Sequence, residues 1–235
     1  MIAVVGDGAA AESAAAALEA AGYGTERIHA GAVGDAELAV AGGEAAVIDL
    51  VAADYDGAVL PVGAERGLPS ADPEGVGPLV EAYRRGDAGT RNNPLLAVEA
   101  DADRVGVAAF DAMLVRSEPG RISEYSVAGG AARSRFRADG VVAATPAGSH
   151  GYARAAGGPR LEPDSGAVAV VPVAVFGMGT PAWVFDPAAG IEIRVERDEG
   201  DVSLLVDGRE RGRLAGEAAV TLSLGGTIET VVPPG

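Results

Sequence analysis

The feature that most constrains this chain is a change of sequence pattern near Asn93. Before that residue, short apolar runs alternate with stretches of helix-forming residues, and glycines and prolines separate them. This alternation is typical of βαβ units, which build a parallel sheet with helices on its faces. The expected strands cover residues 1–5, 36–41 and 57–62, and the expected helices cover 9–21, 44–52 and the segment after Asp72-Pro73.

After Asn93 the sequence changes to short β-prone runs separated by Gly, Asp and Pro. The dipeptide Asp207-Gly208 lies between runs over 202–206 and 209–214, which is the pattern of a two-residue β-hairpin. Few stretches of this part fit a helix.

These patterns predict an α/β + β fold with two domains. Residues 1–92 are expected to form an α/β domain with a glycine-rich phosphate loop, and residues 93–235 a β-rich domain. The seam is placed at residues 89–94.

Composition excludes several classes of protein. The chain has 34 acidic residues against 18 basic ones, and all 18 are arginine, so no lysine is present to contact phosphate as in a P-loop. A net charge of -16 repels polyanions and argues against nucleic-acid binding. The absence of cysteine excludes disulfides and thiolate metal sites.

The apolar runs are too short for a membrane span, which needs about 20 residues. The longest run, residues 167–179, is interrupted by Pro172 and is predicted to be a buried strand. The first residues lack the basic start and long apolar stretch of a signal peptide, so we expect a cytoplasmic protein that does not bind a membrane.

Residues 137–159 carry the densest group of candidate ligand-binding residues. Asp139-Gly140 precedes an apolar strand over 141–144, and Thr145-Pro146-Ala147-Gly148-Ser149 follows that strand. Small residues in such a loop let backbone N–H groups approach a bound molecule closely, and Tyr152 adds a flat face and a hydroxyl. An ordinary Pro/Gly turn is the alternative for this loop taken alone.

The motifs, in their order along the chain, resemble those of the NAD kinase family. That family has GGDGT after a strand of its α/β domain, then an Asn-Glu pair, then DG followed by TPTGSTAYxxSAGGP, and later a DGQ hairpin. Asp139-Gly140 and residues 145–159 match the third element closely and differ from it mainly at His150 and Gly151. Residues 170–173 and 206–209 fall where the family's later β segments would.

Two elements depart from the family pattern. Gly42-Gly43-Glu44-Ala45-Ala46 stands in the place of GGDGT, so Glu44 replaces an aspartate and Ala45 replaces a glycine. Phe110-Asp111 stands in the place of the Asn-Glu pair, which keeps a carboxylate and loses an amide. The extra methylene of Glu44 moves its oxygens by roughly 1.5 Å, and about 1 Å of misplacement can cost about 100-fold in rate. The Cβ of Ala45 would be strained if this position needs a positive φ.

Local sequence leaves alternatives open for most of these residues. Glu44 is equally consistent with a first-turn acid that complements a helix dipole. Phe110 is predicted to pack in the core, because aromatic residues flanked by Val and Ala usually point inward. Asp111 is also consistent with a solvated strand residue. His150 either contacts an adenine ring or is a satisfied loop histidine, and His29 has no supporting context.

The resemblance implies an ATP-dependent kinase that phosphorylates the 2′-hydroxyl of the adenosine ribose of NAD. In this hypothesis Glu44 is the base, Gly42 and Gly43 cradle phosphate, Asp111 and Asp139 hold ribose hydroxyls, and Thr145, Ser149, His150 and Tyr152 line the nucleotide pocket. No metal bound by the protein is expected, because Mg²⁺ would ride on the ATP phosphates. The resemblance also implies the fold: a Rossmann-like α/β domain followed by a C-terminal β-sandwich domain that binds NAD, with the last strand as a candidate to return to the first domain. It further implies a homodimer or homotetramer, in which subunits associate through the β domain and complete each other's pocket.

The alternative hypothesis is a nucleotide-binding homologue that has lost catalysis and acts as a sensor or as the partner subunit of a competent kinase. Its support is the loss of GGDGT and of the Asn-Glu pair together. A weaker hypothesis is a related kinase that acts on a lipid or another small alcohol, and the match over residues 145–152 argues against it. The choice of ATP or polyphosphate as donor, and of NAD or NADH as acceptor, stays open.

The charge pattern predicts a protein adapted to high salt. A lysine-free surface rich in carboxylates suits solubility at molar salt, where self-repulsion is screened. A GC-rich genome that favours Arg and Ala codons is the alternative. We expect the stability of the refolded protein, measured as its thermal unfolding midpoint, to rise with KCl up to the molar range. A midpoint that does not respond to KCl would leave codon bias as the explanation.

Overall fold

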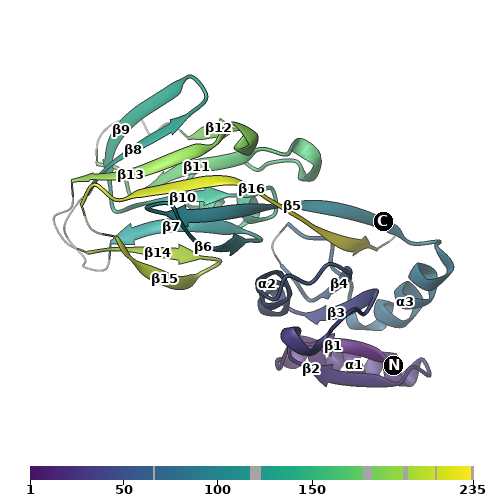
Figure 1. Cartoon of the computed structure of the whole chain (residues 1–235). Coiled ribbons are helices and arrows are strands. Elements are labelled where there is room, and N and C mark those ends of the chain that lie inside the picture. The colour runs from purple at the N-terminus through teal and green to yellow at the C-terminus, as the bar shows by residue number, and fades with distance from the viewer. Residues whose placement is uncertain (66, 117–122, 177–181, 198–200, 215, 234–235) are drawn as a thin grey trace. The chain divides into compact units, whose positions relative to one another are not determined.

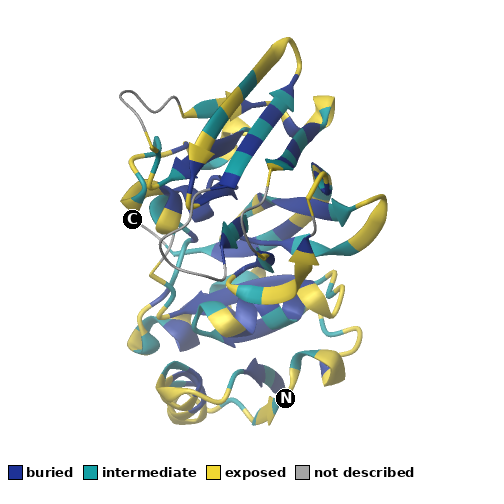
Figure 2. Ribbon diagram, turned by 90° about the vertical axis from the view of Figure 1, so that its left-hand side faces the viewer, coloured by how far each residue is buried: buried dark blue, intermediate teal, exposed yellow. Residues whose placement is uncertain are grey.

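The computed structural model describes residues 1–65, 67–116, 123–176, 182–197, 201–214 and 216–233. The chain divides into two compact units, one formed by Met1–Asn93 with Thr227–Gly235 and the other by Pro94–Gly226. Within each unit, most buried residues lie on the inner strands, and exposed residues lie on helices, turns and edge strands (Figure 2).

The first unit is built on a parallel sheet in the order β2-β1-β3-β4, and the end of β16 pairs with β4 (Figure 1). Its strands are β1 (Ile2–Val5), β2 (Thr25–Ile28), β3 (Leu38–Gly42) and β4 (Ala58–Val62). Its helices are α1 (Ala9–Ala20), α2 (Glu44–Ala52) and α3 (Val76–Arg85), with 3-10 turns η1 (Ala30–Ala32) and η2 (Pro73–Gly75). The connections through α1 and α2 run outward in opposite directions, so right-handed crossovers place these helices on opposite faces.

One core of this unit lies between the sheet and the helices α1 and α3. Val4 of β1 and Leu60 of β4 are fully buried there against Leu18 and Val80. α1 consists mostly of alanine, which has the highest helix propensity and leaves room for a close approach to the sheet. Gly22, with a φ of 87°, follows the helix where a C-terminal stop belongs.

The helices and strands predicted for this part are confirmed, with boundaries that differ by at most two residues. β2 was not predicted. Its two central residues, Glu26 and Arg27, are exposed, and the strand lies at the edge of the sheet, where burial imposes no apolar alternation.

The second unit is a β-sandwich. One sheet is antiparallel in the order β12-β11-β10-β7-β14-β15, and the other contains β16-β13-β8-β9 and the hairpin β5-β6. Side chains of both sheets share one core, in which Leu114, Tyr125 and Ile193 are fully buried. The predicted hairpin is confirmed, with Asp207 (φ 49°) and Gly208 (φ 76°) in its turn. The predicted fold class, a Rossmann-like α/β part and a C-terminal β-sandwich, is therefore confirmed.

The strands of this unit are β6 (Asp103–Ala108), β7 (Asp111–Arg116), β8 (Ser123–Gly129), β9 (Ala132–Ala138), β10 (Gly140–Ala144), β11 (Val168–Val173), β12 (Trp183–Phe185), β13 (Ile191–Arg197), β14 (Val202–Val206) and β15 (Arg209–Leu214). Its helical segments are η3 (Gly148–His150), α4 (Tyr152–Ala155), η4 (Pro163–Ser165) and η5 (Pro187–Ala189).

Two strands contribute to both units. They are β5 (Gly89–Ala100) and β16 (Ala219–Val232), so the residues expected at the seam, 89–94, are part of a strand. Asn93, at the end of the first unit's share of β5, is buried. Its Nδ2 donates to the carbonyl oxygen of Ile228 at 3.3 Å and to Oγ1 of Thr230 at 2.9 Å.

The outer face of β10 and β11 is covered by the segment around α4, through Ala153 and Leu161. Residues 168–173 of the apolar run 167–179 form the buried strand β11, as predicted. Residues 174–176 lie beyond the strand, and residues 177–179 lie outside the described residues. Among the helices that the structure describes, none has the length and apolar character needed to cross a bilayer.

Candidate functional site

Two glycine turns meet at the carboxyl ends of β1 and β3. These strands are neighbours, and the chain leaves them in opposite directions, so the switch point of the sheet lies between them. Open α/β sheets bind ligands in the crevice outside the strand ends at such a point. Gly6 follows β1, and Gly42-Gly43 leads from β3 into α2.

These turns need glycine because they pack against each other and against α1. A Cβ on Gly6 would lie 2.9 Å from the carbonyl oxygen of Gly42. A Cβ on Gly42 would overlap the backbone of Ala11 in the first turn of α1. The beginnings of α1 and α2 are therefore held together at the crevice, where both helix dipoles favour negative charge.

Gly43 adopts the unusual backbone conformation of this turn. Its φ is 86°, and a Cβ there would meet open space. Ala45 lies inside α2 and is not among the residues with positive φ, so the condition under which its Cβ would be strained is not met. The N–H of Gly43 donates to the carbonyl oxygen of Val62 at 2.8 Å, so it faces β4 rather than the crevice.

Glu44 is the first residue of α2 and is half-buried. Its Oε1 accepts a hydrogen bond from the backbone N–H of Glu65 at 3.3 Å, which ties it to the loop after β4. A carboxylate in the first turn also complements the helix dipole, so this position is consistent with the structural interpretation as well as with the catalytic one. Glu44 thus lies at the start of α2, two residues after the end of β3.

In the second unit, Asp111 and Thr145 are brought to the same end of one sheet. Asp111 begins β7 and pairs in register with Ala144, the last residue of β10. Asp111 is only 6% exposed. Asp111 and Thr145, which are 34 positions apart in the chain, are thus brought close together by the pairing of β7 with β10.

The hydroxyls of Thr145 and Ser149 are buried inside the loop between β10 and α4. Oγ1 of Thr145 donates to the carbonyl oxygen of Ala109 at 2.8 Å and accepts from the N–H of Gly148 at 3.2 Å. Oγ of Ser149 donates to the carbonyl oxygen of Pro146 at 2.6 Å and accepts from the N–H of Leu161 at 2.9 Å. Both hydroxyls therefore donate to backbone carbonyl oxygens: Ser149 within the loop, and Thr145 to the segment before β7. These hydrogen bonds fix the shape of the loop and its position against that segment.

Tyr152 and His150 are the side chains that this loop presents outward. Tyr152, at the start of α4, is 48% exposed. His150 is half-buried, with Nδ1 3.4 Å from Nη2 of Arg160. Burial lowers the pKa of His150, and the charges of Arg160 and Arg154 lower it further. The imidazole is therefore held neutral near pH 7, which suits stacking or hydrogen bonding rather than ion pairing.

Asp139 does not join the other predicted residues. It lies before β10, is exposed, and its N–H donates to the carbonyl oxygen of Val173 at 3.0 Å. Thr145 follows the other end of that strand. Because an extended strand advances about 3.3 Å per residue, roughly 20 Å separate the two residues within one chain.

Phe110 and Gly148 fit together behind the loop. Phe110 is fully buried, so its predicted place in the core is confirmed. Its carbonyl oxygen accepts from the N–H of Thr145 at 2.8 Å. A Cβ on Gly148 would overlap that same carbonyl oxygen, so the loop can close on residues 109–111 only with glycine at this position.

Asp207 is a residue whose role the sequence did not reveal. Its carboxylate, 6% exposed, accepts three backbone N–H groups, from Ala109 at 2.8 Å, Phe110 at 2.8 Å and Asp111 at 3.0 Å. Its own N–H donates to the carbonyl oxygen of Asp111 at 2.8 Å. The β14-β15 turn thereby holds the segment that carries Asp111. The Asp-Gly hairpin was the available signal, but it indicated a turn and not the target of its side chain.

Comparison with known proteins connects this arrangement to one family. Residues 111–233 match the family model described as the ATP-NAD kinase C-terminal domain. NAD kinases of Methanosarcina barkeri and Thermococcus kodakarensis are 32% and 33% identical to the chain over 52% and 51% of its length. The matched regions cover 45% and 44% of those proteins, so the chain spans about half the length of the curated relatives it matches.

Solved structures share the whole fold. The NAD kinase from Archaeoglobus fulgidus in complex with ATP aligns with a TM-score of 0.79 at 18% identity, over 97% of this chain and 92% of that one. Yeast NADH kinase complexed with NADH aligns with a TM-score of 0.75 at 18% identity, over 84% of this chain and 63% of that one. At this level of identity the likeness establishes the fold.

Replacing Asp207 with asparagine tests its hold on residues 109–111. We expect Asp207→Asn to lower the free energy of unfolding by about 2–3 kcal/mol, because the NH2 group replaces the oxygen that accepts from the N–H of Ala109 and leaves this buried donor without an acceptor. Chemical denaturation measures this change. Asp201→Asn is the matched control, since Asp201 forms an exposed pair with Arg213 and should cost less than about 0.5 kcal/mol. Equal losses in the two variants would contradict the assigned role.

Proposed function

Because the chain belongs to the NAD kinase family, we propose that it phosphorylates the 2′-hydroxyl of the adenosine ribose of NAD with ATP, giving NADP and ADP. In the transfer, the ribose oxygen attacks the γ-phosphorus, and the bond from that phosphorus to the oxygen bridging to the β-phosphate breaks. The proton of the ribose hydroxyl passes to a carboxylate. Mg²⁺ enters with the ATP substrate and spreads the charge of its phosphates.

The observation that carries the proposal is the position of Glu44. It is the acid at the start of α2, beside the switch point of the sheet, and the N–H of Glu65 orients its carboxylate. The N–H groups in the first turn of a helix have no acceptor within the helix, so the start of α2 offers donors for phosphate oxygens. The first turn of α2 then supplies both the general base, Glu44, and the N–H groups that donate hydrogen bonds to phosphate oxygens.

The second unit supports binding of the dinucleotide. Asp111 at the start of β7 offers a carboxylate for ribose hydroxyls, and Tyr152 offers an exposed aromatic face. The neutral His150 provides a further flat surface beside the loop. The buried hydroxyls of Thr145 and Ser149 keep the loop in shape for these contacts.

Asp139 fits this proposal when a second copy of the chain takes part. About 20 Å of extended strand separates Asp139 from Thr145, yet Asp139 is exposed at the other end of β10. We therefore propose a homodimer or homotetramer in which Asp139 serves the nucleotide pocket of the neighbouring subunit. We also place the protein in the cytoplasm of a salt-adapted cell, so molar KCl is the medium for every assay.

A nucleotide-binding homologue without catalysis is the second candidate. Two observations favour it. The position of the family's asparagine is taken by Phe110, which is fully buried and presents no amide to a ligand. The longer side chain of Glu44 is tied to the loop after β4.

The activity test is NADP formation from NAD, ATP and Mg²⁺ in molar KCl, resolved by chromatography. We expect the wild-type chain to form NADP and Glu44→Ala to lower kcat by about 100-fold or more, because the general base is lost. Glu44→Asp is the matched variant, and it should retain activity because it restores the family's residue. Glu44→Ala with wild-type activity would remove Glu44 from the mechanism. A wild-type chain that forms no NADP, but whose melting temperature rises with NAD, would establish the second candidate.

Mixing two inactive variants tests the proposed role of Asp139. If each pocket uses its own Glu44 and the neighbour's Asp139, then Asp139→Ala and Glu44→Ala complement each other in mixed dimers. A fully exchanged equimolar mixture should recover about one quarter of wild-type activity, since about half of the dimers are mixed and each has one intact pocket. Subunit exchange is followed by native mass spectrometry. An exchanged mixture as inactive as its components would show that each pocket uses residues of a single chain.

A further inference from the structure

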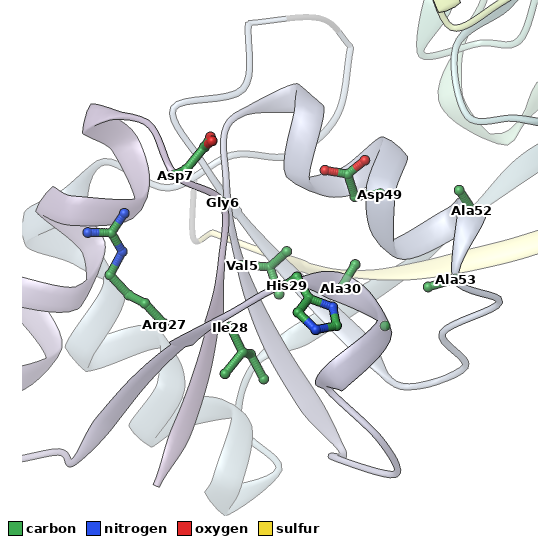
Figure 3. Close-up of a pocket in the computed structure, with 11 residues that line it drawn as sticks. Val5, Gly6, Asp7, Arg27, Ile28, His29, Ala30, Asp49, Ala52 and Ala53 are labelled. Atoms are coloured by element: carbon green, nitrogen blue, oxygen red, sulfur yellow. The ribbon is translucent and has the colours of Figure 1, made fainter.

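A cavity in the first unit lies at the carboxyl ends of β1 and β2 and extends along α2 (Figure 3). Its volume is about 740 Å³. Gly6 lines it and also packs against the carbonyl oxygen of Gly42, so this cavity belongs to the candidate site described above. The second unit holds a separate group of buried polar side chains. This group lies at the end of β7 opposite Asp111 and takes no part in the proposed reaction.

Arg116 and Tyr125 bring polar atoms into the core of the sandwich from its two sheets. Arg116 ends β7, on the same face of that strand as the core residues Ala112 and Leu114. Tyr125 belongs to β8 in the other sheet, and its ring stacks on Phe136 with the ring centroids 5.9 Å apart. Arg116 is only 8% exposed, and Tyr125 is fully buried. Both polar groups are therefore held away from solvent.

Three polar atoms of this pair have no hydrogen-bond partner among the residues that the structure describes. They are Nε and Nη2 of Arg116 and the hydroxyl oxygen of Tyr125. Nη1 of Arg116 donates to Oγ of Ser123 at 3.1 Å. Burial raises the pKa of Tyr125 to about 12, although the hydroxyl of Ser123 and the charge of Arg116 oppose the rise. The phenol is therefore protonated at neutral pH and can donate a hydrogen bond.

The charge of Arg116 also needs compensation. A guanidinium does not lose its proton in a protein, and a buried charge without a counter-charge is strongly destabilising. The N–H of Arg116 donates to the carbonyl oxygen of Asp139 at 3.1 Å. The carboxylate of Asp139 raises the pKa of Tyr125, but Asp139 is exposed, and within the described part of the chain it accepts from none of the three atoms. The pair thus offers N–H and O–H donors together with a positive charge.

We propose that Arg116 and Tyr125 bind one halide ion inside the sandwich, which in the cell is chloride. A halide carries one negative charge, has no proton of its own, and accepts hydrogen bonds from several directions. A phosphate ester carries further atoms behind its charge, whereas these donors are buried in a core, so the small spherical ion suits them. The bound ion neutralises the guanidinium and joins the end of β7 to β8. This inference does not depend on the proposed kinase function.

The folding equilibrium, measured against chloride concentration, tests the site. Urea unfolding is followed at constant ionic strength in the molar range, with potassium glutamate exchanged for KCl. If the folded state binds one ion and the unfolded state binds none, the logarithm of the folding constant rises with the logarithm of chloride concentration above the Kd, with a slope of about one. We expect the wild-type chain to show this slope with KCl and with KBr.

Three variants assign the slope to this site. Arg116→Met removes the charge and its donors, and we expect a slope near zero. Tyr125→Phe removes only the hydroxyl and keeps the ring, so it should raise the Kd of chloride by about tenfold, the effect of one lost hydrogen bond. Arg213→Met is the matched control, because Arg213 is an exposed residue paired with Asp201 at 2.8 Å, and it should keep the wild-type slope.

A wild-type slope near zero, or the wild-type slope in Arg116→Met, would overturn the inference. If Arg116→Met does not fold, Tyr125→Phe decides, since an unchanged Kd of chloride in that variant contradicts the site. Crystals grown in KBr provide a direct view. We expect an anomalous bromide peak in contact with Nε and Nη2 of Arg116 and with the hydroxyl of Tyr125, and a difference map without that peak would also contradict the inference.

Discussion

The close contact between Gly42 and the backbone of Ala11 is the constraint on which the crevice depends. It brings the turn after β3 against the first turn of α1, and Gly6 closes the same contact from the side of β1. Any side chain at Gly42 would separate the starts of the two helices. The position of Glu44, the direction of both helix dipoles and the wall of the adjoining cavity all follow from this one approach of backbone to backbone.

Much of the fold could be predicted from the sequence, because local preferences and global packing agree. The alanine-rich run that forms α1 and the apolar run that forms β4 each fit one kind of element, and glycines mark their ends. β2 escaped prediction because an edge strand with exposed Glu26 and Arg27 carries no such pattern. The seam was placed at residues 89–94, whereas in the structure these residues begin β5, which pairs with the distant strand β16.

The site was predictable in its parts and not in its assembly. The motif over residues 145–159 predicted a loop after an apolar strand, and the structure confirms that this loop follows the buried strand β10. Asp139 and Thr145 are close in sequence, yet the whole of β10 separates them. Distance in sequence hid the link between Asp207 and residues 109–111, which only the neighbouring strands β7 and β14 bring together. Strand pairing decides these positions, and pairing partners are not visible in one sequence.

The sharing of β16 between the units has a consequence for synthesis on the ribosome. Thr230 of β16 pairs with Val59 of β4, and Val231 is fully buried in the core of the first unit. Translation delivers these residues only after all of Pro94–Gly226 has emerged. The N-terminal domain of a multidomain protein usually folds first during synthesis. Here the first unit cannot complete its sheet until the last residues of the chain have been translated. The core of the sandwich can therefore form before the first unit is complete. Until residues 227–233 are available, β4 is an unpaired edge of the parallel sheet.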